Sequence, residues 1–98
     1  MMRTFSGRRT VATIGQVLPL SDVWAGPIAS LDVVALDTNT SLIYIGAENT
    51  VAAVGSQCGI PMRASDVMHY ENVWLKDIFI DARVAGEGVT FGGTYEGT

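Results

Sequence analysis

Hydrophobic and polar residues alternate along most of this chain, and short polar turns separate the alternating runs. A period of two is the signature of a β-strand with one apolar face. The two clearest runs are residues 29–36 and 78–84. The apolar residues that share one face within these runs are Leu31, Val33, Ala35, Ile78, Ile80, Ala82 and Val84. On the opposite face of the second run, we expect Asp81 and Arg83 to form an exposed ion pair worth about 0–1 kcal/mol.

Shorter apolar runs predict further strands at residues 8–14, 16–20, 42–45, 67–75 and 89–91. Pro19 has no amide to donate, which makes its run an edge strand or the end of a strand. In the run from residue 67 to residue 75, we expect the side chains of Met68, Tyr70 and Trp74 to point inward.

Polar or irregular segments separate these runs. Residues 37–41 have the length and polarity of a hairpin loop. Residues 47–55, rich in small side chains, predict a loop with at most a short turn of helix. Ile60 and Met62 are expected to plug one end of the core, while Pro61 prevents further pairing.

The two ends of the chain differ from the middle. Residues 1–7 predict an N-terminal arm with Phe5 as its one large apolar anchor, and residues 8–98 then form the domain. Residues 92–98 predict a glycine-rich tail that is mobile in isolation.

The pattern as a whole predicts an all-β fold. Short strands with turn signals every few residues are typical of a single small antiparallel β-sandwich, or a jelly-roll-like barrel, of about six to eight strands. A helix over residues 21–35 is the alternative, and Gly26-Pro27 interrupts it.

Composition adds the expectation of a partner. Of the 98 residues, 48% are hydrophobic and 16% are charged, so few charges are available to cover the surface of so small a domain. Exposed apolar area on a small domain more often marks an interface than a bare face. We therefore expect a homo-oligomer or a subunit of a larger assembly.

Charge and cysteine content favour some classes of protein over others. The net charge of −4 and the lack of a basic stripe argue against nucleic-acid binding. A single cysteine, Cys58, rules out an intrachain disulfide and is consistent with folding in a reducing cytoplasm. No signal peptide and no apolar run long enough to cross a membrane are visible in the sequence.

Residues with catalytic or metal-binding chemistry are few. His69 lies two residues from Glu71, so both are expected on one strand face, where a surface pair is favoured over a general base. Nothing in the sequence around Cys58 activates it as a nucleophile. The loop carboxylates, such as Asp37 and Glu48, match no calcium-loop spacing. We therefore predict no enzyme activity, no cofactor and no metal.

Partner contacts are expected from six residues near the chain ends and in one loop. The tryptophans could instead stack on sugar rings, as in a carbohydrate-binding module, although capping of a small core is favoured for them. The candidate partner-binding residues are Arg3, Phe5, Arg8, Arg9, Trp24 and Tyr95.

Three segments in this order resemble a family of small structural proteins from the particles of tailed bacteriophages and prophages. They are residues 38–46 (TNTSLIYIG), residues 59–62 (GIPM) and residues 77–91 (DIFIDARVAGEGVTF). The resemblance covers about residues 31–91. The chain departs from the family where Arg63-Ala64-Ser65-Asp66 follows the second segment, because the family has a different turn there.

The resemblance implies a non-enzymatic component of the virion, made in the host cytoplasm. In its favoured form the protein is a capsid-decoration or cement protein, a homotrimer that binds the major capsid protein through its N-terminal arm. A neck, tail or fibre-attachment protein is the first alternative. A free-standing module that binds carbohydrate or protein is the second.

Overall fold

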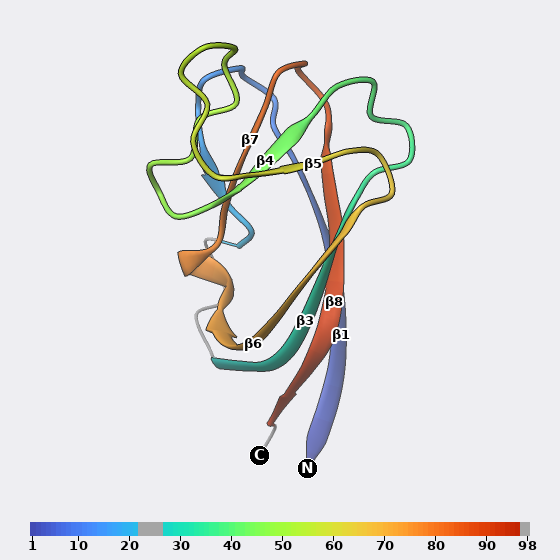
Figure 1. Ribbon diagram of the computed structural model, residues 1–98. Coiled ribbons are helices and arrows are strands. Elements are labelled where there is room, and N and C mark those ends of the chain that lie inside the picture. The colour runs from blue at the N-terminus through green and yellow to red at the C-terminus, as the bar shows by residue number, and fades with distance from the viewer. Residues whose placement is uncertain (22–26, 97–98) are drawn as a thin grey trace.

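The computed structural model of the protein describes residues 1–21 and 27–96 and shows an all-β fold, as the sequence predicts (Figure 1). Two antiparallel four-stranded sheets pack face to face as a small β-sandwich. The strands are β1 (Met2–Thr10), β2 (Leu18–Pro19), β3 (Pro27–Ala35), β4 (Ile43–Gly46), β5 (Ile60–Met62), β6 (Val67–Trp74), β7 (Phe79–Ala82) and β8 (Gly88–Glu96). One turn of 3₁₀ helix, η1 (Leu75–Asp77), joins β6 to β7.

The two sheets differ in length. The long sheet has the order β1-β8-β3-β6, and the short sheet has the order β2-β7-β4-β5. Both ends of the described chain lie together where β1 and β8 project beyond the short sheet (Figure 1). There the amino group of Met1 lies 2.6 Å from Oε1 of Glu96.

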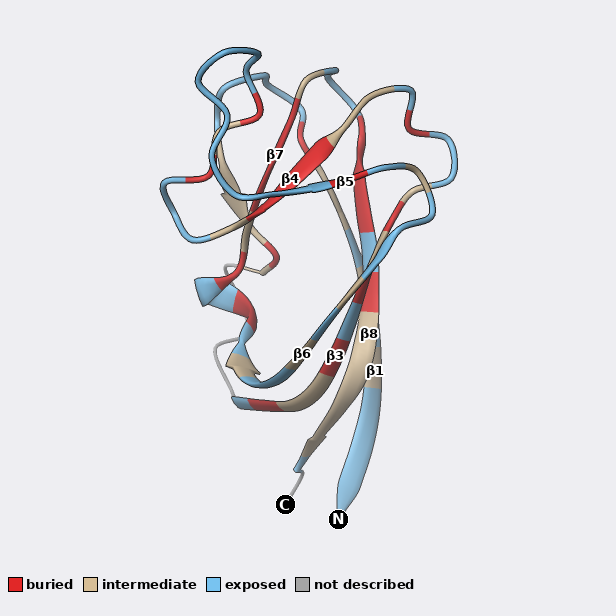
Figure 2. Cartoon of the chain, in the orientation of Figure 1, coloured by how far each residue is buried: buried red, intermediate tan, exposed pale blue. Residues whose placement is uncertain are grey.

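The core lies where the two sheets overlap, and the projecting part of β1 is exposed (Figure 2). Alternate residues of β3 and β8 supply one side of it, and β4 and β7 supply most of the other. The largest fully buried side chains are Ile28, Leu31, Ile43, Ile45, Met62, Leu75, Ile80, Val11, Val33 and Val89. Because this burial removes most of the large aliphatic side chains from water, it is the main stabilising term of the fold.

Residues 2–7 of the predicted arm and residues 92–96 of the predicted tail belong to one pair of strands. Residues 2–7 belong to β1, which pairs with β8 from Met2 opposite Glu96 to Thr10 opposite Gly88. The prediction of a separate arm and a mobile tail was wrong, because these two segments satisfy each other's backbone hydrogen bonds. Glycine permits the close approach of β1 at Gly88, where a Cβ would overlap the carbonyl oxygen of Arg9. It also permits the close approach of β3 at Gly93, where a Cβ would overlap the carbonyl oxygen of Ser30.

Asp81 and Arg83 do not form the expected exposed ion pair. Asp81 is 2% exposed and accepts hydrogen bonds from the backbone amides of Ala52, at 2.9 Å, and Ala82, at 2.9 Å. The Arg83 Nε donates to the Ala52 carbonyl at 2.6 Å, and the guanidinium lies 5.3 Å from the Tyr44 ring. The outer face of the short sheet is therefore covered by the loop that contains Ala52.

β6 changes its alternation at Asn72, which has a positive φ of 54°. Met68 and Tyr70 pack against the core as expected, but Val73 takes the next inward position in place of Trp74. Trp74 is 40% exposed, and the Lys76 Nζ lies 5.3 Å from the centre of its ring. The inward placement of Trp74 was wrong because a single left-handed residue reverses the two faces of the strand.

One of the two residues expected to plug the end of the core does so. Met62 is buried, whereas Ile60 is 49% exposed. Pro61 does not end the pairing, since it lies opposite Tyr44 within β5 at the edge of the short sheet. An edge strand tolerates proline because one side of the strand needs no hydrogen bonds. Residues 47–55 form turns, with an isolated bridge between Val51 and Cys58.

Candidate interaction surface

The structure brings together most of the residues expected to bind a partner. Arg3, Phe5, Arg8 and Arg9 all lie on β1, and Tyr95 lies directly opposite Arg3 on β8. Trp24 falls outside the described residues. The remaining five residues thus belong to one two-stranded ribbon at the edge of the long sheet.

Aromatic packing holds this ribbon together. The ring of Phe5 lies 6.4 Å from the ring of Phe91 and 6.2 Å from that of Tyr95, measured between centroids. A Cβ on Gly7 would collide with the Phe91 ring, so glycine is required opposite that residue. Phe5 therefore anchors β1 within its own chain rather than on a neighbour.

Among the described strands, β1 and β6 form the two edges of the long sheet (Figure 1). Each leaves a row of backbone amides and carbonyls without a strand beside it in that part of the chain. β1 has nine residues and β6 has eight, which is long for edge strands, and neither contains proline. Long edges of this kind are the places where another strand can add to a sheet.

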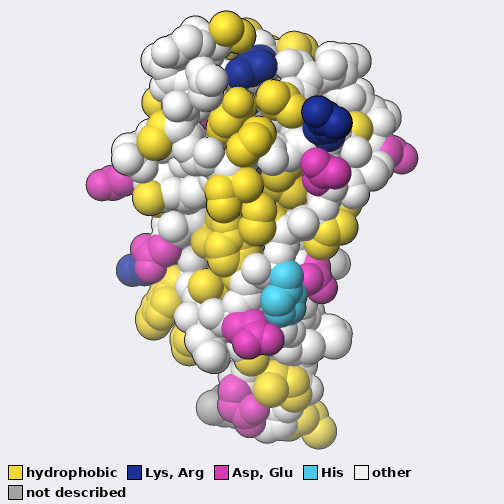
Figure 3. Space-filling model, in the orientation of Figure 1, with side chains coloured by type: hydrophobic (Ala, Val, Ile, Leu, Met, Phe, Trp, Pro, Cys, Tyr) yellow, Lys and Arg dark blue, Asp and Glu magenta, His cyan; other side chains and the backbone are white. Residues whose placement is uncertain are grey.

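The β6 edge carries an acidic cluster centred on His69. The His69 Nδ1 lies 2.7 Å from Oδ1 of Asp32, and its Nε2 lies 3.3 Å from Oε1 of Glu71. Figure 3 shows the histidine with acidic side chains on either side of it. The hydrogen bond to Asp32, followed by that to Glu71, raises the pKa of His69 above its usual value of 6.5.

This arrangement suits a surface charge cluster better than a catalytic base. Because carboxylates engage both ring nitrogens, the imidazolium form is favoured, and no ring nitrogen is left with a free lone pair for proton abstraction. The sequence paired His69 with Glu71 but missed Asp32, which lies directly opposite His69 on β3. The alternation of the two strands indicated that Asp32 and His69 are both exposed. It did not indicate that the two strands are neighbours in the sheet.

Glu87 makes a second polar site, at the opposite end of the sandwich from the termini. Its carboxylate accepts hydrogen bonds from the Thr40 amide at 2.5 Å, the Thr40 hydroxyl at 2.8 Å and the Ser41 amide at 3.1 Å. Asn39 completes the link, donating to the Gly88 carbonyl at 2.9 Å and accepting from its amide at 3.2 Å. The two loops are thereby clamped together.

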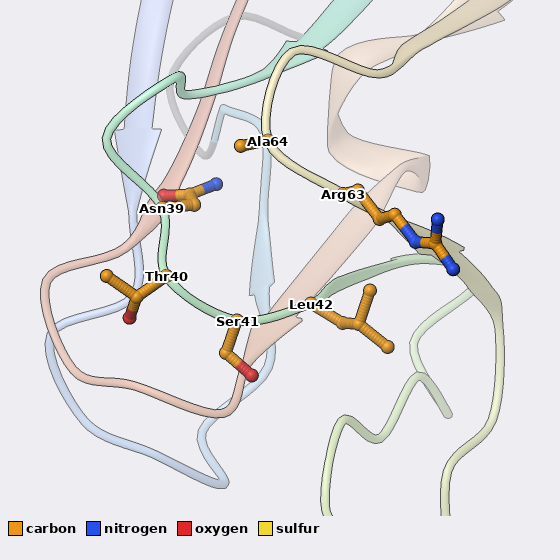
Figure 4. A pocket seen from close by; sticks show the side chains of 6 residues that line it. All are labelled: Asn39, Thr40, Ser41, Leu42, Arg63 and Ala64. Atoms are coloured by element: carbon orange, nitrogen blue, oxygen red, sulfur yellow. The ribbon is translucent and has the colours of Figure 1, made fainter.

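The acidity of Glu87 reflects this clamp. Burial pushes the pKa of Glu87 up, but the hydrogen bonds from Thr40 and Ser41 outweigh it and hold the pKa below the usual 4.5. An open cavity of about 400 Å³ lies beside the clamp, lined by Asn39, Thr40, Ser41, Leu42, Arg63 and Ala64 (Figure 4). At its wall, the Asn39 side chain, the Thr40 hydroxyl and the amides of Thr40 and Ser41 are already used in holding the loops, so these groups act structurally.

A second cleft, of about 440 Å³, opens beside the end of β6. Tyr70, Val73 and Trp74 line it together with the polar side chains of Asn72 and Asp77. An exposed tryptophan next to polar side chains is a surface on which a flat apolar ring could stack.

Large apolar side chains are exposed at several places on the described surface. Figure 3 shows hydrophobic side chains gathered along the middle of the face on which β6 lies in front. The exposed large hydrophobic residues are Met1, Met2, Ile14, Val54, Ile60, Val67, Trp74 and Val84. Val67 belongs to the β6 edge and is 60% exposed. These residues agree with the expectation, drawn from composition, that apolar area is left on the surface.

Other kinds of site are not found in the described part of the chain. Within residues 1–21 and 27–96, no group of histidine, cysteine and acidic side chains is arranged to hold a metal ion. No helix in the same residues is long and apolar enough to cross a membrane. Cys58 is exposed and unpaired with another cysteine. No family model, no curated protein and no solved structure matches this chain.

Proposed function

We propose that this protein is a non-enzymatic structural component of a tailed-bacteriophage particle. In this proposal it decorates or cements the capsid, bound to the major capsid protein, as a homo-oligomer that is favoured to be a trimer. It is then found on the surface of the virion.

The proposal is carried by the arrangement of the three segments that resemble the phage family. They contribute β4, β5 and β7, which are neighbours in the order β7-β4-β5, together with the start of β8. Asn39 in the first segment is hydrogen-bonded to Gly88 in the third. Segments far apart in the sequence thus make one connected unit of the fold, as segments of one shared motif would.

The surface gives separate support. A small sandwich with few charges, exposed apolar side chains and two long open edges is suited to a subunit that gains stability from its neighbours. Binding of this kind stabilises the folded state by RT ln(1 + c/Kd), where c is the free concentration of the partner, so the gain increases with that concentration relative to the dissociation constant.

The direct test is the number of copies per particle. Quantitative gel analysis of purified particles should show this chain at a copy number similar to that of the shell subunit. A much smaller number would instead place it at the neck, tail or fibre attachment, and its absence from particles would refute the proposal. Deleting residues 1–7 is not a suitable test, because they supply most of β1.

A carbohydrate-binding module is a second candidate, and the cleft beside Trp74 favours it. There the exposed indole stands next to Asn72 and Asp77, whose side chains could hydrogen-bond to sugar hydroxyls. Fluorescence titration with cello-, malto- and chito-oligosaccharides tests this directly. Saturable quenching that is lost in Trp74→Ala would support the module, and a flat response to all three would remove it.

A further inference from the structure

We propose that copies of this chain associate by edge-to-edge pairing, in which β1 of one copy adds to the free edge of β6 of the next. The long sheet then continues from one copy to another. This inference names the surface that the oligomer of the proposed function would use, and it rests on that function only for the expectation that copies meet.

Strand direction permits this pairing. All neighbours in the order β1-β8-β3-β6 are antiparallel, so β1 and β6 of one copy run in opposite directions. If a second copy is rotated about an axis parallel to the strands, each of its strands still runs in the same direction as in the first copy. Its β1 therefore lies antiparallel to β6 of the first copy. Because this contact joins two different surfaces, repeating it from copy to copy gives a closed ring when the rotation between neighbouring copies is a whole fraction of a full turn.

The backbone hydrogen bonds point the right way. The Val11 amide donates to the Glu87 carbonyl, in continuation of the β1–β8 register. Odd-numbered residues of β1 therefore bond to β8, and the even-numbered ones direct their amides and carbonyls to the free edge. The Ala35 amide donates to the Asp66 carbonyl in the same way, so the odd-numbered residues of β6 that precede Asn72 are the ones that face its free edge.

The side chains of these outward-directed residues lie on one face of the long sheet. Ser6 and Arg8 on β1, and His69 and Glu71 on β6, are all exposed. The alternate residues of both strands, such as Phe5 and Tyr70, pack against the core instead. A pairing that matches the hydrogen bonds therefore also keeps the packed face of the sheet on one side, as a continuous sheet requires.

Length then selects one register. Two antiparallel alignments pair all eight residues of β6 with β1, and only one of them matches the faces over residues 67–71, before the faces of β6 reverse at Asn72. In that register Thr10 lies opposite Val67, Arg8 opposite His69 and Ser6 opposite Glu71. The positive charge of His69 opposite Arg8 is offset by its two carboxylate partners, Asp32 and Glu71. Arg8 is also the diagonal neighbour of Glu71, within reach of a long side chain.

Charge favours this pairing over self-pairing of β1. β1 carries Arg3, Arg8 and Arg9, whereas the β6 edge carries Glu71 and is flanked by Asp32. Two β1 strands paired over their full length would place Arg3 opposite Arg9 twice, and like charges that face each other across strands are destabilising. The arginines thus act against β1–β1 pairing while attracting the acidic edge.

Disulfide trapping tests the register. In a Cys58→Ser background, Thr10→Cys and Val67→Cys place thiols on the two edges, separated within one copy by three strand spacings, or about 14 Å. This exceeds the reach of a disulfide, about 7 Å between Cα atoms, so any bond must join two copies. Under mild oxidation, a mixture of the two single variants should give a disulfide-linked dimer, and the double variant should give a ladder of higher species.

Two controls make this result decisive. Each single variant alone should remain uncrosslinked, and a mixture of Thr10→Cys with the exposed-loop variant Ser56→Cys should give only a background level. Crosslinking of either single variant with itself at the level of the mixture would overturn the proposal in favour of self-pairing. A mixture that does not crosslink above the Ser56→Cys background would also overturn it.

Charge reversal tests the energetics. Arg8→Glu and Glu71→Arg should each weaken self-association about tenfold in analytical ultracentrifugation, and the double variant should recover most of the loss. Arg63→Glu makes the same change in net charge as Arg8→Glu, at an exposed residue outside both edge strands, and should leave association unchanged. Equal weakening by Arg63→Glu, no recovery in the double variant, or a wild-type monomer at high micromolar concentration would overturn edge pairing.

Failure of edge pairing and failure of the proposed function give different results. If the protein is found in purified particles but does not crosslink between β1 and β6, the phage function stands and the inference falls. If it crosslinks as expected but is absent from particles, the inference stands and the phage function falls.

Discussion

Replacing Glu87 with glutamine should destabilise the protein at neutral pH by removing one acceptor from the loop clamp. The carboxylate accepts three hydrogen bonds, and two of them come from the backbone amides of Thr40 and Ser41. The amide can keep its oxygen toward Thr40, but its NH₂ group must then face the Ser41 amide, donor against donor. One lost charge-assisted bond and one amide without its acceptor cost about 1–3 kcal/mol.

The loss should depend on pH, with a sign set by the pKa of Glu87. Because the folded pKa is below the usual 4.5, the carboxylate contributes stability that is present above pH 4.5 and is lost as the pH falls through the folded pKa. Wild type and Glu87→Gln should therefore differ at pH 7 and converge in acid, where protonated Glu87 resembles glutamine.

Thermal unfolding followed by circular dichroism measures this difference. A loss of 1–3 kcal/mol corresponds to a decrease in melting temperature of roughly 5–20 °C for a domain of this size. Glu48→Gln, at an exposed position, removes the same charge and should shift the melting temperature little. Two results would refute the role assigned to the clamp. One is an equal shift in melting temperature in both variants, and the other is a difference between wild type and Glu87→Gln that does not decrease in acid.

Three further predictions follow from other contacts. Asp81→Asn should lower the free energy of unfolding, measured in urea, by about 1–3 kcal/mol, because the buried carboxylate accepts hydrogen bonds from the amides of Ala52 and Ala82. Asp77→Asn, at an exposed position, should be nearly neutral in the same assay. The NMR titration of His69 should show a midpoint above 6.5 that falls in Asp32→Asn; its contribution to stability is present below pH 6.5 and disappears as the pH rises through the folded pKa. Gly93→Ala should lose about 2–3 kcal/mol from overlap with Ser30. The loss should clearly exceed that of Gly92→Ala, whose added Cβ would lie 3.1 Å from the Phe5 carbonyl oxygen and otherwise at ordinary contact distance from Ser6.

Alternation was sufficient to predict the fold class and several inward faces. Leu31, Val33 and Ile80 are fully buried as predicted, because strand geometry alone determines which side chains share a face. The faces were wrong where the backbone departs from regular geometry, as at Asn72, or where a loop covers a face that alternation marks as outer, as at Asp81.

Pairing between distant segments was not predictable in the same way. Arg3 and Tyr95 were singled out separately, and their position opposite each other depends on a strand order that no local pattern encodes. The glycines of residues 92–98 suggested mobility, although at Gly93 the missing side chain permits close packing. The Asp32–His69 contact was missed for the same reason, since it requires knowing that β3 and β6 are neighbours.

The position of β8 in the long sheet has a consequence for how the protein folds during translation. β8 lies between β1 and β3, and it is the last of the described strands to be synthesised. Neither β1 nor β3 can therefore pair with this neighbour until synthesis has reached β8. Forming the β1–β8 pair also closes a loop of nearly the whole chain, and sheets with such distant contacts fold slowly, in milliseconds to seconds. The nascent chain therefore carries β1 without its neighbour until β8 has been made, so the long sheet can be completed only after every other described strand has been synthesised.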